Sequence, residues 1–388
     1  MGVERIALLG PAPPDRGGIA RETALLANEL APRTTLSYFT FSRPYPRWLD
    51  PRRFDSVPGA GRAVPPARPV LDYRSPLSWR MTASEIADFA PDVLLAPWWT
   101  SFWGLPLRAI FRRVRARSPR TLRSLLCHNV DDHESGSLQR FLALGAFLSS
   151  DAFVVHAEED RRRLARRVRE VPIAVLPHPV VAGPRFERET ARHELGITRP
   201  LVLFLGLVRR YKGVDVLLEA APSIVRETGA RIAVVGEVFS EARELEDRWR
   251  QSPVREAILW RDEYVSEEEM ARWLAACDVV VLPYRYVSGS GIAARAIAAR
   301  RPICAAGVGG LAETVEPGVT GELFEPGDAG ALARAVRRAL ERGLSAYAPG
   351  LERAAEEASW PRYVDRLLGF LGSVETRAQR RERRASAR

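Results

Sequence analysis

Short apolar runs alternate with longer amphipathic segments along the first half of the chain. The runs have the length of strands, and the segments between them carry apolar residues at the helical period. This alternation predicts a parallel sheet that is covered by helices on both faces. Residues 43–69 are rich in Pro and Arg and have no clear period, which predicts a long surface excursion. The strand-like runs are RIALLG, PDVLLAP, LRSLLCHN and AFVVHA, and the predicted helices cover residues 18–30, 102–117, 135–149 and 157–169.

A second alternation of the same kind begins after the segment LPHPVVAGPRF. It predicts a second doubly wound α/β domain, and ligands of such sheets bind at the carboxyl ends of the strands. We therefore expect two Rossmann-like domains that face each other across a cleft. The predicted parts are a first domain at 1–183, a second at 184–358, a helix at 359–372 that crosses back to the first domain, and a disordered basic tail at 373–388. The second set of runs is LVLFLG, RIAVVG, AILW, DVVVLP, PICAA and GELFE, and its predicted helices cover residues 213–228, 240–251, 266–276, 291–300, 328–343 and 360–372.

Composition favours a folded protein without a membrane span. A chain of 388 residues suits two domains, and 46% apolar with 27% charged residues is typical of a soluble protein. No apolar run is long enough to cross a bilayer. The opening MGVERIALLG predicts a first strand rather than a signal peptide, and hence a cytoplasmic location. Three widely separated cysteines predict buried thiols; they are Cys127, Cys277 and Cys304.

The net charge of +10 suits nucleic acid, an anionic membrane surface or an anionic small substrate. No nucleic-acid-binding motif accompanies the charge, and arginine is spread over the whole chain, so we expect no nucleic-acid partner. Weak peripheral association with the inner face of the membrane is the further expectation, because the basic tail adds to the charge.

The segment FLGLVRRYKGVDVLLEA leaves a strand at Gly206 and begins a helix after Gly213. Arg209 and Lys212 lie between these glycines. Positive side chains beside a helix N-terminus favour a multiply charged anion, because the backbone N–H groups and the helix dipole favour negative charge too. The alternative is a loop whose cations are only solvated, as we expect for Arg210.

The segment PYRYVSGSGIAARAIAARRP has a similar organisation but contains no carboxylate. Ser290, Gly291 and Ile292 are expected to present backbone N–H groups at the start of a helix, which suits phosphate. Arg295 follows one turn later and points either at the ligand or at a neighbouring acid.

Two polar motifs occur in the first half. Gly17 and Gly18 open a helix without the G-x-G-x-x-G pattern of nicotinamide enzymes, and they permit either a close substrate or only a tight turn. His128 and Asn129 follow a predicted strand. His128 would either contact a sugar hydroxyl or form its hydrogen bonds within its own loop. We expect no metal, because CHNVDDHE matches no metal-binding spacing and the other histidines are remote in sequence. The remote histidines are His156, His178 and His193.

The order of the motifs GPAPPDRGGIA, CHN, SDAFVVHAEEDRRRL, FLGLVRRYKGVDVLLEA, SGSG and GVGGLAETVEPGVTGELFEPGD resembles the group 1 branch, or family 4, of retaining glycosyltransferases. The resemblance extends to about Gly372 and is similar to a subgroup with a YKG turn and a Ser-Gly loop. It implies the GT-B fold, with a nucleotide-sugar held chiefly by the second domain. It also implies that Lys212 and Arg209 hold the donor's diphosphate, although many members have the arginine at the position of Leu207.

The resemblance also implies that His128 faces the transferred sugar. Many relatives carry two glutamates around the loop, and the matching positions here are Val287 and Arg295, which cannot accept a hydrogen bond through their side chains. The donor's base and sugar therefore stay open. The residues assigned to donor binding are Gly17, Gly18, Gly206, Ser290, Gly291, Ile292 and Arg295, and catalytic roles fall to His128, Arg209 and Lys212.

The implied activity is retaining transfer of a sugar from a nucleotide-diphosphate sugar, the co-substrate, without a metal or other cofactor. The acceptor is a glycan, a lipid-linked molecule or a small molecule. A nucleotide-sugar epimerase of the same fold and a catalytically inactive nucleotide-sugar-binding protein are the alternatives. Four aromatic residues follow a predicted strand of the first domain, and three roles are open for them: stacking on a sugar, contact with a lipid carrier, or internal packing. They are Trp98, Trp99, Phe102 and Trp103.

Overall fold

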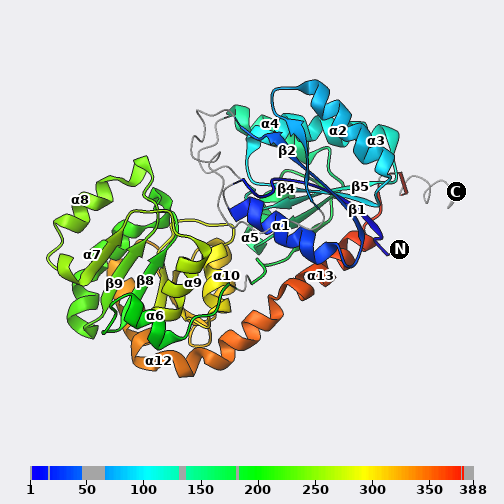
Figure 1. Ribbon diagram of the computed structural model, residues 1–388. Helices are drawn as coiled ribbons and strands as arrows, with labels where there is room; N and C mark the ends of the chain where they lie inside the picture. Colours follow the sequence, from blue (N-terminus) through cyan, green and yellow to red (C-terminus); the bar gives the residue numbers. More distant parts are fainter. Residues whose placement is uncertain are drawn as a thin grey trace. The chain divides into compact units, whose positions relative to one another are not determined.

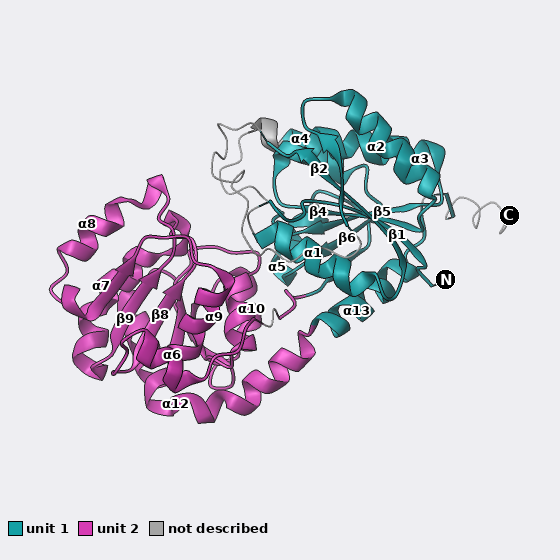
Figure 2. Ribbon diagram, viewed as in Figure 1, with its two compact units in different colours: residues 1–176, 360–388 teal, residues 177–359 magenta. Residues whose placement is uncertain are grey.

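The structure of the chain is a computed structural model that describes residues 2–15, 18–45, 66–130, 137–180, 183–376 and 378–379. The chain forms two compact units (Figure 2). The first unit contains Met1–Leu176 and Trp360–Arg388, and the second contains Pro177–Ser359. Each unit is built on its own parallel sheet, with helices on both faces (Figure 1).

The first sheet has seven strands in the order β3-β2-β1-β4-β5-β6-β7. Its strands are β1 (Arg5–Leu9), β2 (Thr35–Arg43), β3 (Arg68–Asp72), β4 (Val93–Trp98), β5 (Leu122–Cys127), β6 (Ala152–Val155) and β7 (Ile173–Val175). Its helices are α1 (Gly18–Leu30), α2 (Pro76–Phe89), α3 (Gly104–Arg117), α4 (Ser137–Phe147), α5 (Glu158–Ala165) and α13 (Trp360–Ser373). Ile6 and Leu8 enter the core that contains α1 and α13, whereas Ala7 and Leu9 enter the core that contains α2 to α5. Burial on both faces explains the unbroken apolar run of β1.

The second sheet has six strands in the order β10-β9-β8-β11-β12-β13 around a single core. Its strands are β8 (Leu201–Leu205), β9 (Arg231–Val235), β10 (Ile258–Arg261), β11 (Val279–Leu282), β12 (Ile303–Ala306) and β13 (Gly321–Phe324). Its α-helices are α6 (Arg188–Glu194), α7 (Val214–Thr228), α8 (Glu244–Arg250), α9 (Glu267–Ala276), α10 (Gly291–Ala298), α11 (Gly309–Thr314) and α12 (Ala329–Glu357).

The strand order of each sheet reverses once, between β1 and β4 and between β8 and β11. Ligands of doubly wound sheets bind beyond the carboxyl ends of the strands at such a switch point. In the second unit, β8 leads into the segment with Gly206 and Lys212, and β11 leads into the Ser-Gly loop. The topology therefore directs two segments that are far apart in sequence to one end of the sheet.

Helix α13 belongs to the first unit, although the residues of the second unit separate it from β7 in the sequence. Its apolar residues form one stripe that packs into the core with α1. Arg33, shortly after α1, supports the contact through a 2.8 Å ion pair with Asp365. The buried stripe consists of Tyr363, Val364, Leu367 and Leu371.

Several local predictions need correction. The sequence does not predict β2, β3, β7, α2, α6 or α11. The elements β3, β7, α6 and α11 are short, and in β2 and α2 polar residues interrupt the apolar period. Most of the predicted excursion at 43–69 lies outside the described residues, as do residues 380–388 of the predicted tail. The part of that tail nearest α13 is packed instead, because Val374 contacts the core and Thr376 is buried.

Two composition-based predictions can be compared with the structure. Cys127, Cys277 and Cys304 are buried, unpaired thiols, which confirms the expectation from their spacing. No helix among the described residues combines the length and the apolar character needed to cross a bilayer.

Candidate nucleotide-sugar site

Predicted residues from both glycine-containing segments meet at the switch point of the second sheet. Gly206 follows β8 with φ of +104°, a conformation that side-chain-bearing residues rarely adopt. A Cβ atom at Gly206 would lie 3.4 Å from the side chain of Ile292 and 3.7 Å from Nζ of Lys212. The structure therefore brings Gly206, Lys212 and Ile292 together, although 86 positions separate the first from the last.

Gly213 fixes the turn that presents Lys212. The turn is a short 3₁₀ helix, Arg210–Lys212, and Gly213 follows with φ of +65°. A Cβ atom at Gly213 would lie only 1.9 Å from the carbonyl oxygen of Pro283, just after β11. Only glycine fits this close backbone approach, so the KG pair of the sequence has a steric cause.

Lys212 is half-buried beside an aromatic ring. Its Nζ lies 5.3 Å from the ring centroid of Tyr284, within the range of a cation–π contact. Burial, with a smaller contribution from the positive charge of Arg209, lowers the pKa of Lys212 to about 8. An anionic ligand would replace the lost hydration and stabilise the ammonium form, so this position is suited to phosphate.

Arg209 and Arg210 have different environments. The guanidinium of Arg209 stacks 3.8 Å from the ring centroid of Phe239 and lies 4.0 Å from a carboxylate oxygen of Glu241. Arg210 is exposed and pairs with Glu244 at 3.3 Å. Arg209 is therefore held close enough to affect Lys212, whereas Arg210 pairs at the surface, in keeping with the solvated role expected for it.

The Ser-Gly loop starts α10 as predicted. The hydroxyl of Ser290 accepts a hydrogen bond from the backbone N–H of Ala293 at 3.2 Å and caps the helix. The hydroxyl of Tyr284 is buried near Ser290, though not in hydrogen-bonding geometry. Burial, and then the nearby Tyr211, raise the pKa of Tyr284 well above its usual range, so this hydroxyl stays protonated. The loop therefore places a buried phenol next to the helix N-terminus.

The guanidinium of Arg295 pairs with Glu267. It donates hydrogen bonds of 2.6 Å and 3.0 Å to the two carboxylate oxygens of Glu267 in α9. The sequence leaves two alternatives for Arg295, a ligand or a neighbouring acid, and this contact is the second. The assignment of Arg295 to donor binding therefore loses its main support, because the guanidinium already bonds Glu267 of α9.

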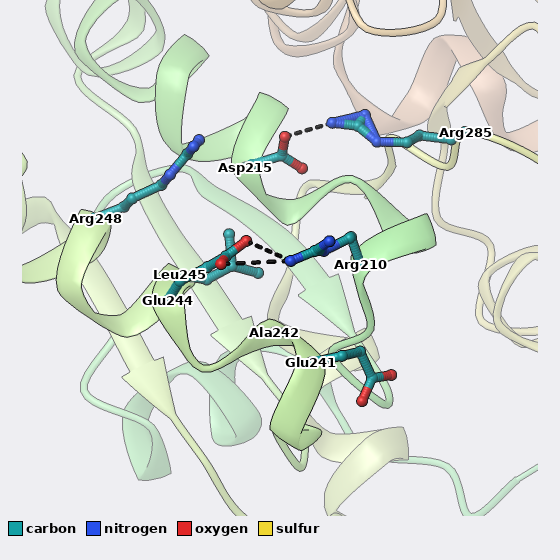
Figure 3. Close-up of a pocket in the computed structure, with 8 residues that line it drawn as sticks. All are labelled: Arg210, Asp215, Glu241, Ala242, Glu244, Leu245, Arg248 and Arg285. Atoms are coloured by element: carbon teal, nitrogen blue, oxygen red, sulfur yellow. Dashed lines mark hydrogen bonds and ion pairs between the residues drawn. The ribbon is translucent and has the colours of Figure 1, made fainter.

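A pocket of about 170 Å³ lies beside the turn that carries Lys212 (Figure 3). It is lined mainly by charged side chains that pair with one another, such as Arg210 with Glu244 and Arg285 with Asp215. None of its lining residues is Gly206, Lys212 or Ser290, so this pocket is a neighbour of the predicted donor site. The lining residues are Arg210, Asp215, Glu241, Ala242, Glu244, Leu245, Arg248 and Arg285.

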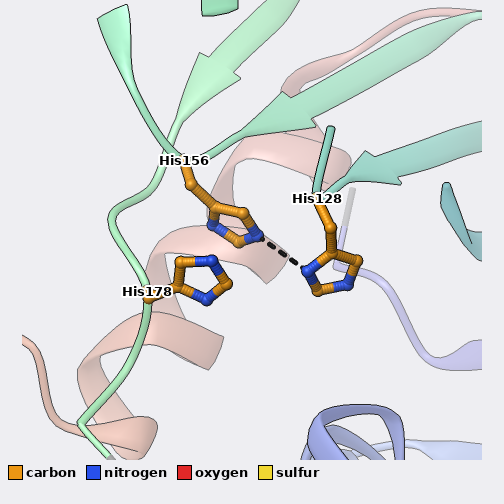
Figure 4. A group of neighbouring side chains, drawn as sticks. All are labelled: His128, His156 and His178. Carbon is orange, nitrogen blue, oxygen red and sulfur yellow. Dashed lines mark hydrogen bonds between the residues drawn. The ribbon is translucent and has the colours of Figure 1, made fainter. Parts of the chain in front are cut away.

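His128 of the first unit lies in a buried polar cluster. Nδ1 of His128 is 3.3 Å from Oε2 of Glu22 in α1 and 3.3 Å from Nε2 of His156 (Figure 4). His156 also contacts the carbonyl oxygen of Leu176 through Nδ1 at 2.9 Å. The expectation that all other histidines are too remote to join His128 is wrong for His156. Cys127 and Val155 are register partners, so the residues after β5 and β6 lie side by side.

The remaining predictions in the first unit have mixed outcomes. Gly17 lies outside the described residues. Gly18 begins α1, and a Cβ atom there would meet nothing within 4 Å, so packing does not require this glycine. The side chain of Asn129 donates to the carbonyl of Trp99 at 3.4 Å. Of the aromatic group, Trp98 and Trp103 are fully buried, which supports the interpretation as an internal cluster.

Comparisons with known proteins address the second unit most directly. The family model described as "Glycosyl transferases group 1" matches residues 199–342. The D-inositol 3-phosphate glycosyltransferase of Xylanimonas cellulosilytica is 34% identical over 195 residues, which are 46% of each chain. D-inositol 3-phosphate glycosyltransferase 1 of Catenulispora acidiphila is 33% identical over 58% of each chain. These alignments span about half the length of the curated relatives.

Solved structures match over nearly the whole chain. Sucrose-phosphate synthase from Thermosynechococcus elongatus has a TM-score of 0.71 at 19% identity, covering 94% of this chain and 97% of the other. The Anabaena protein HepE in complex with UDP-glucose also has a TM-score of 0.71, at 15% identity, covering 96% and 100%. At these identities the likeness concerns the fold. The chain therefore has the GT-B fold of these structures, and its residues 199–342 are similar to the group 1 glycosyltransferase model.

Proposed function

We propose that this protein is a retaining glycosyltransferase that uses a nucleotide-diphosphate sugar as donor and needs no metal ion. The observation that carries the proposal is the position of Lys212. Its partly desolvated ammonium lies at the switch point of the second sheet, beside Gly206 and the α10 segment, and its pKa is lowered to about 8. A cation held in this way is suited to a diphosphate.

The proposed role of this site is to stabilise the leaving nucleoside diphosphate. Negative charge grows on the diphosphate as the bond to the sugar breaks. Lys212, Arg209 and the N–H groups at the start of α10 supply fixed positive charge and hydrogen-bond donors, so no cation needs to be recruited. Tyr284 contributes a protonated hydroxyl near the same helix start.

The first unit is proposed to contact the transferred sugar and the acceptor. Gly18 leaves open space next to the start of α1, and His128 lies at the carboxyl edge of the sheet. Retention follows from the family resemblance: the acceptor attacks on the face from which the diphosphate departs, and a phosphate oxygen takes the acceptor's proton.

The acceptor is proposed to be a polyol, a glycan or a lipid-linked sugar. The names of the relatives in Xylanimonas and Catenulispora make inositol 3-phosphate a natural first acceptor to test. A lipid-linked acceptor is supported by apolar side chains exposed on the first unit. Phe141 and Leu144 of α4, with Leu148 just after it, are 64%, 37% and 54% exposed. Leu77 and Met81 of α2 are exposed as well.

Basic residues accompany these apolar side chains. Helix α3 contacts both α2 and α4 and carries five arginines. Exposed apolar side chains with arginines between them fit an anionic bilayer surface better than a neutral one. We therefore propose weak peripheral association with anionic lipid through α2, α3 and α4. The arginines of α3 are Arg108, Arg112, Arg113, Arg115 and Arg117.

The test begins with thermal unfolding in the presence of a panel of nucleotide-sugars. A stabilising donor is then incubated with each acceptor class, and the anomeric configuration of the product is read by NMR. We expect one donor class to raise the Tm and to yield a product that keeps the donor's anomeric configuration. Inversion would contradict the retaining mechanism, and isomerised donor without acceptor would identify an epimerase.

A further inference from the structure

Contacts with Leu176 and Glu22 indicate where the hydrogen atoms lie on the neutral rings of His128 and His156. The carbonyl oxygen of Leu176 can only accept a hydrogen bond, so Nδ1 of His156, 2.9 Å away, carries a hydrogen. A neutral His156 then has its lone pair on Nε2. This lone pair faces Nδ1 of His128 at 3.3 Å (Figure 4).

Glu22 places a second acceptor against the same nitrogen. Its Oε2 lies 3.3 Å from Nδ1 of His128, and an ionised carboxylate cannot donate a hydrogen bond. Two acceptors facing one imidazole nitrogen are satisfied only if that nitrogen carries the hydrogen. The neutral ring of His128 is therefore the Nδ1–H tautomer, with its lone pair on Nε2.

Tyr363 of α13 is a further titratable group near Glu22. Burial, and then the charge of Glu22, raise the pKa of Tyr363 far above its usual range, so the phenol stays neutral. It adds no negative charge to the cluster, and Glu22 supplies the carboxylate that faces His128.

We propose that Glu22 and His156 are positioning residues that hold the proton of His128 on Nδ1. Nε2 of the neutral ring then serves as a hydrogen-bond acceptor, which selects a hydroxyl group rather than a carbonyl or carboxylate oxygen at this point of the ligand. If His128 gains a second proton, the carboxylate of Glu22 offsets the charge. The identity of that hydroxyl as part of a sugar rests on the proposed function, whereas the tautomer does not.

Histidine tautomers can be measured without any activity assay. The chain contains five histidines, so ¹⁵N-histidine labelling gives five imidazole pairs, and His128→Asn assigns the pair of interest by its disappearance. We expect His128 to show a protonated Nδ1 and an unprotonated Nε2 in the full-length protein. The double variant Glu22→Met/His156→Phe, which removes both acceptors, should populate the Nε2–H form. A wild-type His128 with its hydrogen on Nε2, or a double variant that keeps Nδ1–H, would overturn the proposal.

Kinetics provide a second readout once a donor and an acceptor are known. Glu22→Met/His156→Phe should lower kcat about 10-fold or more with little change in donor KM, as expected when a histidine takes the wrong tautomer. Glu22→Gln/His156→Gln keeps an oxygen acceptor at both positions and should recover most of the rate. His193→Phe is the matched control, because His193 lies on α6 of the second unit. Equal losses in the two double variants would reduce Glu22 and His156 to packing residues. If Glu22→Met/His156→Phe does not fold, Glu22→Leu/His156→Leu carries the same test.

If no donor supports transfer, the proposed function fails, yet the NMR result still decides the tautomer. The two proposals can therefore fail independently.

Discussion

Arg295 of α10 and Glu267 of α9 form a two-pronged contact, with N–O distances of 2.6 Å and 3.0 Å. The planar guanidinium matches the carboxylate, which is the geometry that gives such pairs their specificity. Within the second unit, this contact joins α9 and α10.

Arg295→Ala should lower the free energy of unfolding by about 1 kcal/mol, since the pair is only partly shielded from water. The side chains of Arg295 and Glu267 are 14% and 39% exposed. Donor KM should change little. Arg295→Glu should cost more stability, because it opposes two carboxylates, and the charge swap with Glu267→Arg should restore most of the loss. A large rise in donor KM at unchanged stability would return Arg295 to the donor site.

Lys212→Met should reduce kcat by about 10²- to 10³-fold, the usual loss when one charge-stabilising group is removed from a reaction centre. The matched control is Arg210→Met, which removes an exposed, paired cation two residues away. Steady-state kinetics of both variants at saturating donor measure the effect. Similar activity in the two variants would end the assignment of Lys212 to the diphosphate.

The lowered pKa of Lys212 predicts two opposite pH dependences. Donor binding needs the ammonium form, so affinity should fall as the pH rises through about 8. Stability should change the other way. The pKa of Lys212 is lowered from 10.5 to about 8, so between these values the unfolded chain binds more protons and this group's contribution to stability rises with pH. Donor titrations and denaturant unfolding at pH 7, 8, 9 and 10 are compared between the unaltered protein and Lys212→Met. The difference isolates the two trends, because buried thiols and phenols, whose pKa values are raised by burial, change stability in the opposite direction in both proteins.

Gly213→Ala should destabilise the second unit much more than Gly229→Ala. Both glycines have φ of +65°, so both alanines carry similar backbone strain, about 1–2 kcal/mol. Only at Gly213 does the new Cβ meet the carbonyl oxygen of Pro283, whereas at Gly229 it meets nothing within 4 Å. The difference between their free energies of unfolding therefore isolates the clash. Equal losses would mean that the turn moves away from β11 without cost.

Activity should survive dialysis against EDTA, because the proposed charge stabilisation comes from Lys212, Arg209 and backbone N–H groups. Turnover before and after chelation, with Mg²⁺, Mn²⁺ or Zn²⁺ added back, is the measurement. Zn²⁺ belongs in the series because imidazoles such as His128 and His156 are ligands that it prefers. Loss with EDTA and recovery with one ion would replace the metal-free mechanism.

Membrane association should depend on the apolar side chains of α4. Phe141→Ser/Leu148→Ser should reduce sedimentation with anionic vesicles at low salt, while Tyr264→Ser should not, because Tyr264 is an exposed aromatic residue of the second unit. Binding of the unaltered protein should weaken at high salt, since charges at a surface are screened. Equal binding to neutral and anionic vesicles would contradict an electrostatic contribution.

The sequence predicts the part of the fold that rests on strong periodicity and tight turns. The paired alternations specify two parallel sheets, and the KG turn is predicted because Gly213 adopts a positive φ, which is a local requirement. The contact of His156 with His128 is missed because it depends on the register of β5 with β6, which local spacing does not show. Glu22 is missed because its contact depends on how α1 packs on the sheet. Arg295 is ambiguous for a related reason. Its partner lies on another helix, which only tertiary packing brings near.

Helix α13 has a consequence for the order in which the chain can fold during synthesis. The second unit is an insertion between Leu176 and Trp360 of the first. All of its strands have left the ribosome before the residues of α13, which the first unit needs to cover Ile6 and Leu8. Domains generally fold as units while the chain emerges. The unit that is translated first is therefore the one completed last. Until α13 emerges, α1 alone packs on the sheet face that contains Ile6 and Leu8, and the apolar surface left open is of the kind that chaperones bind.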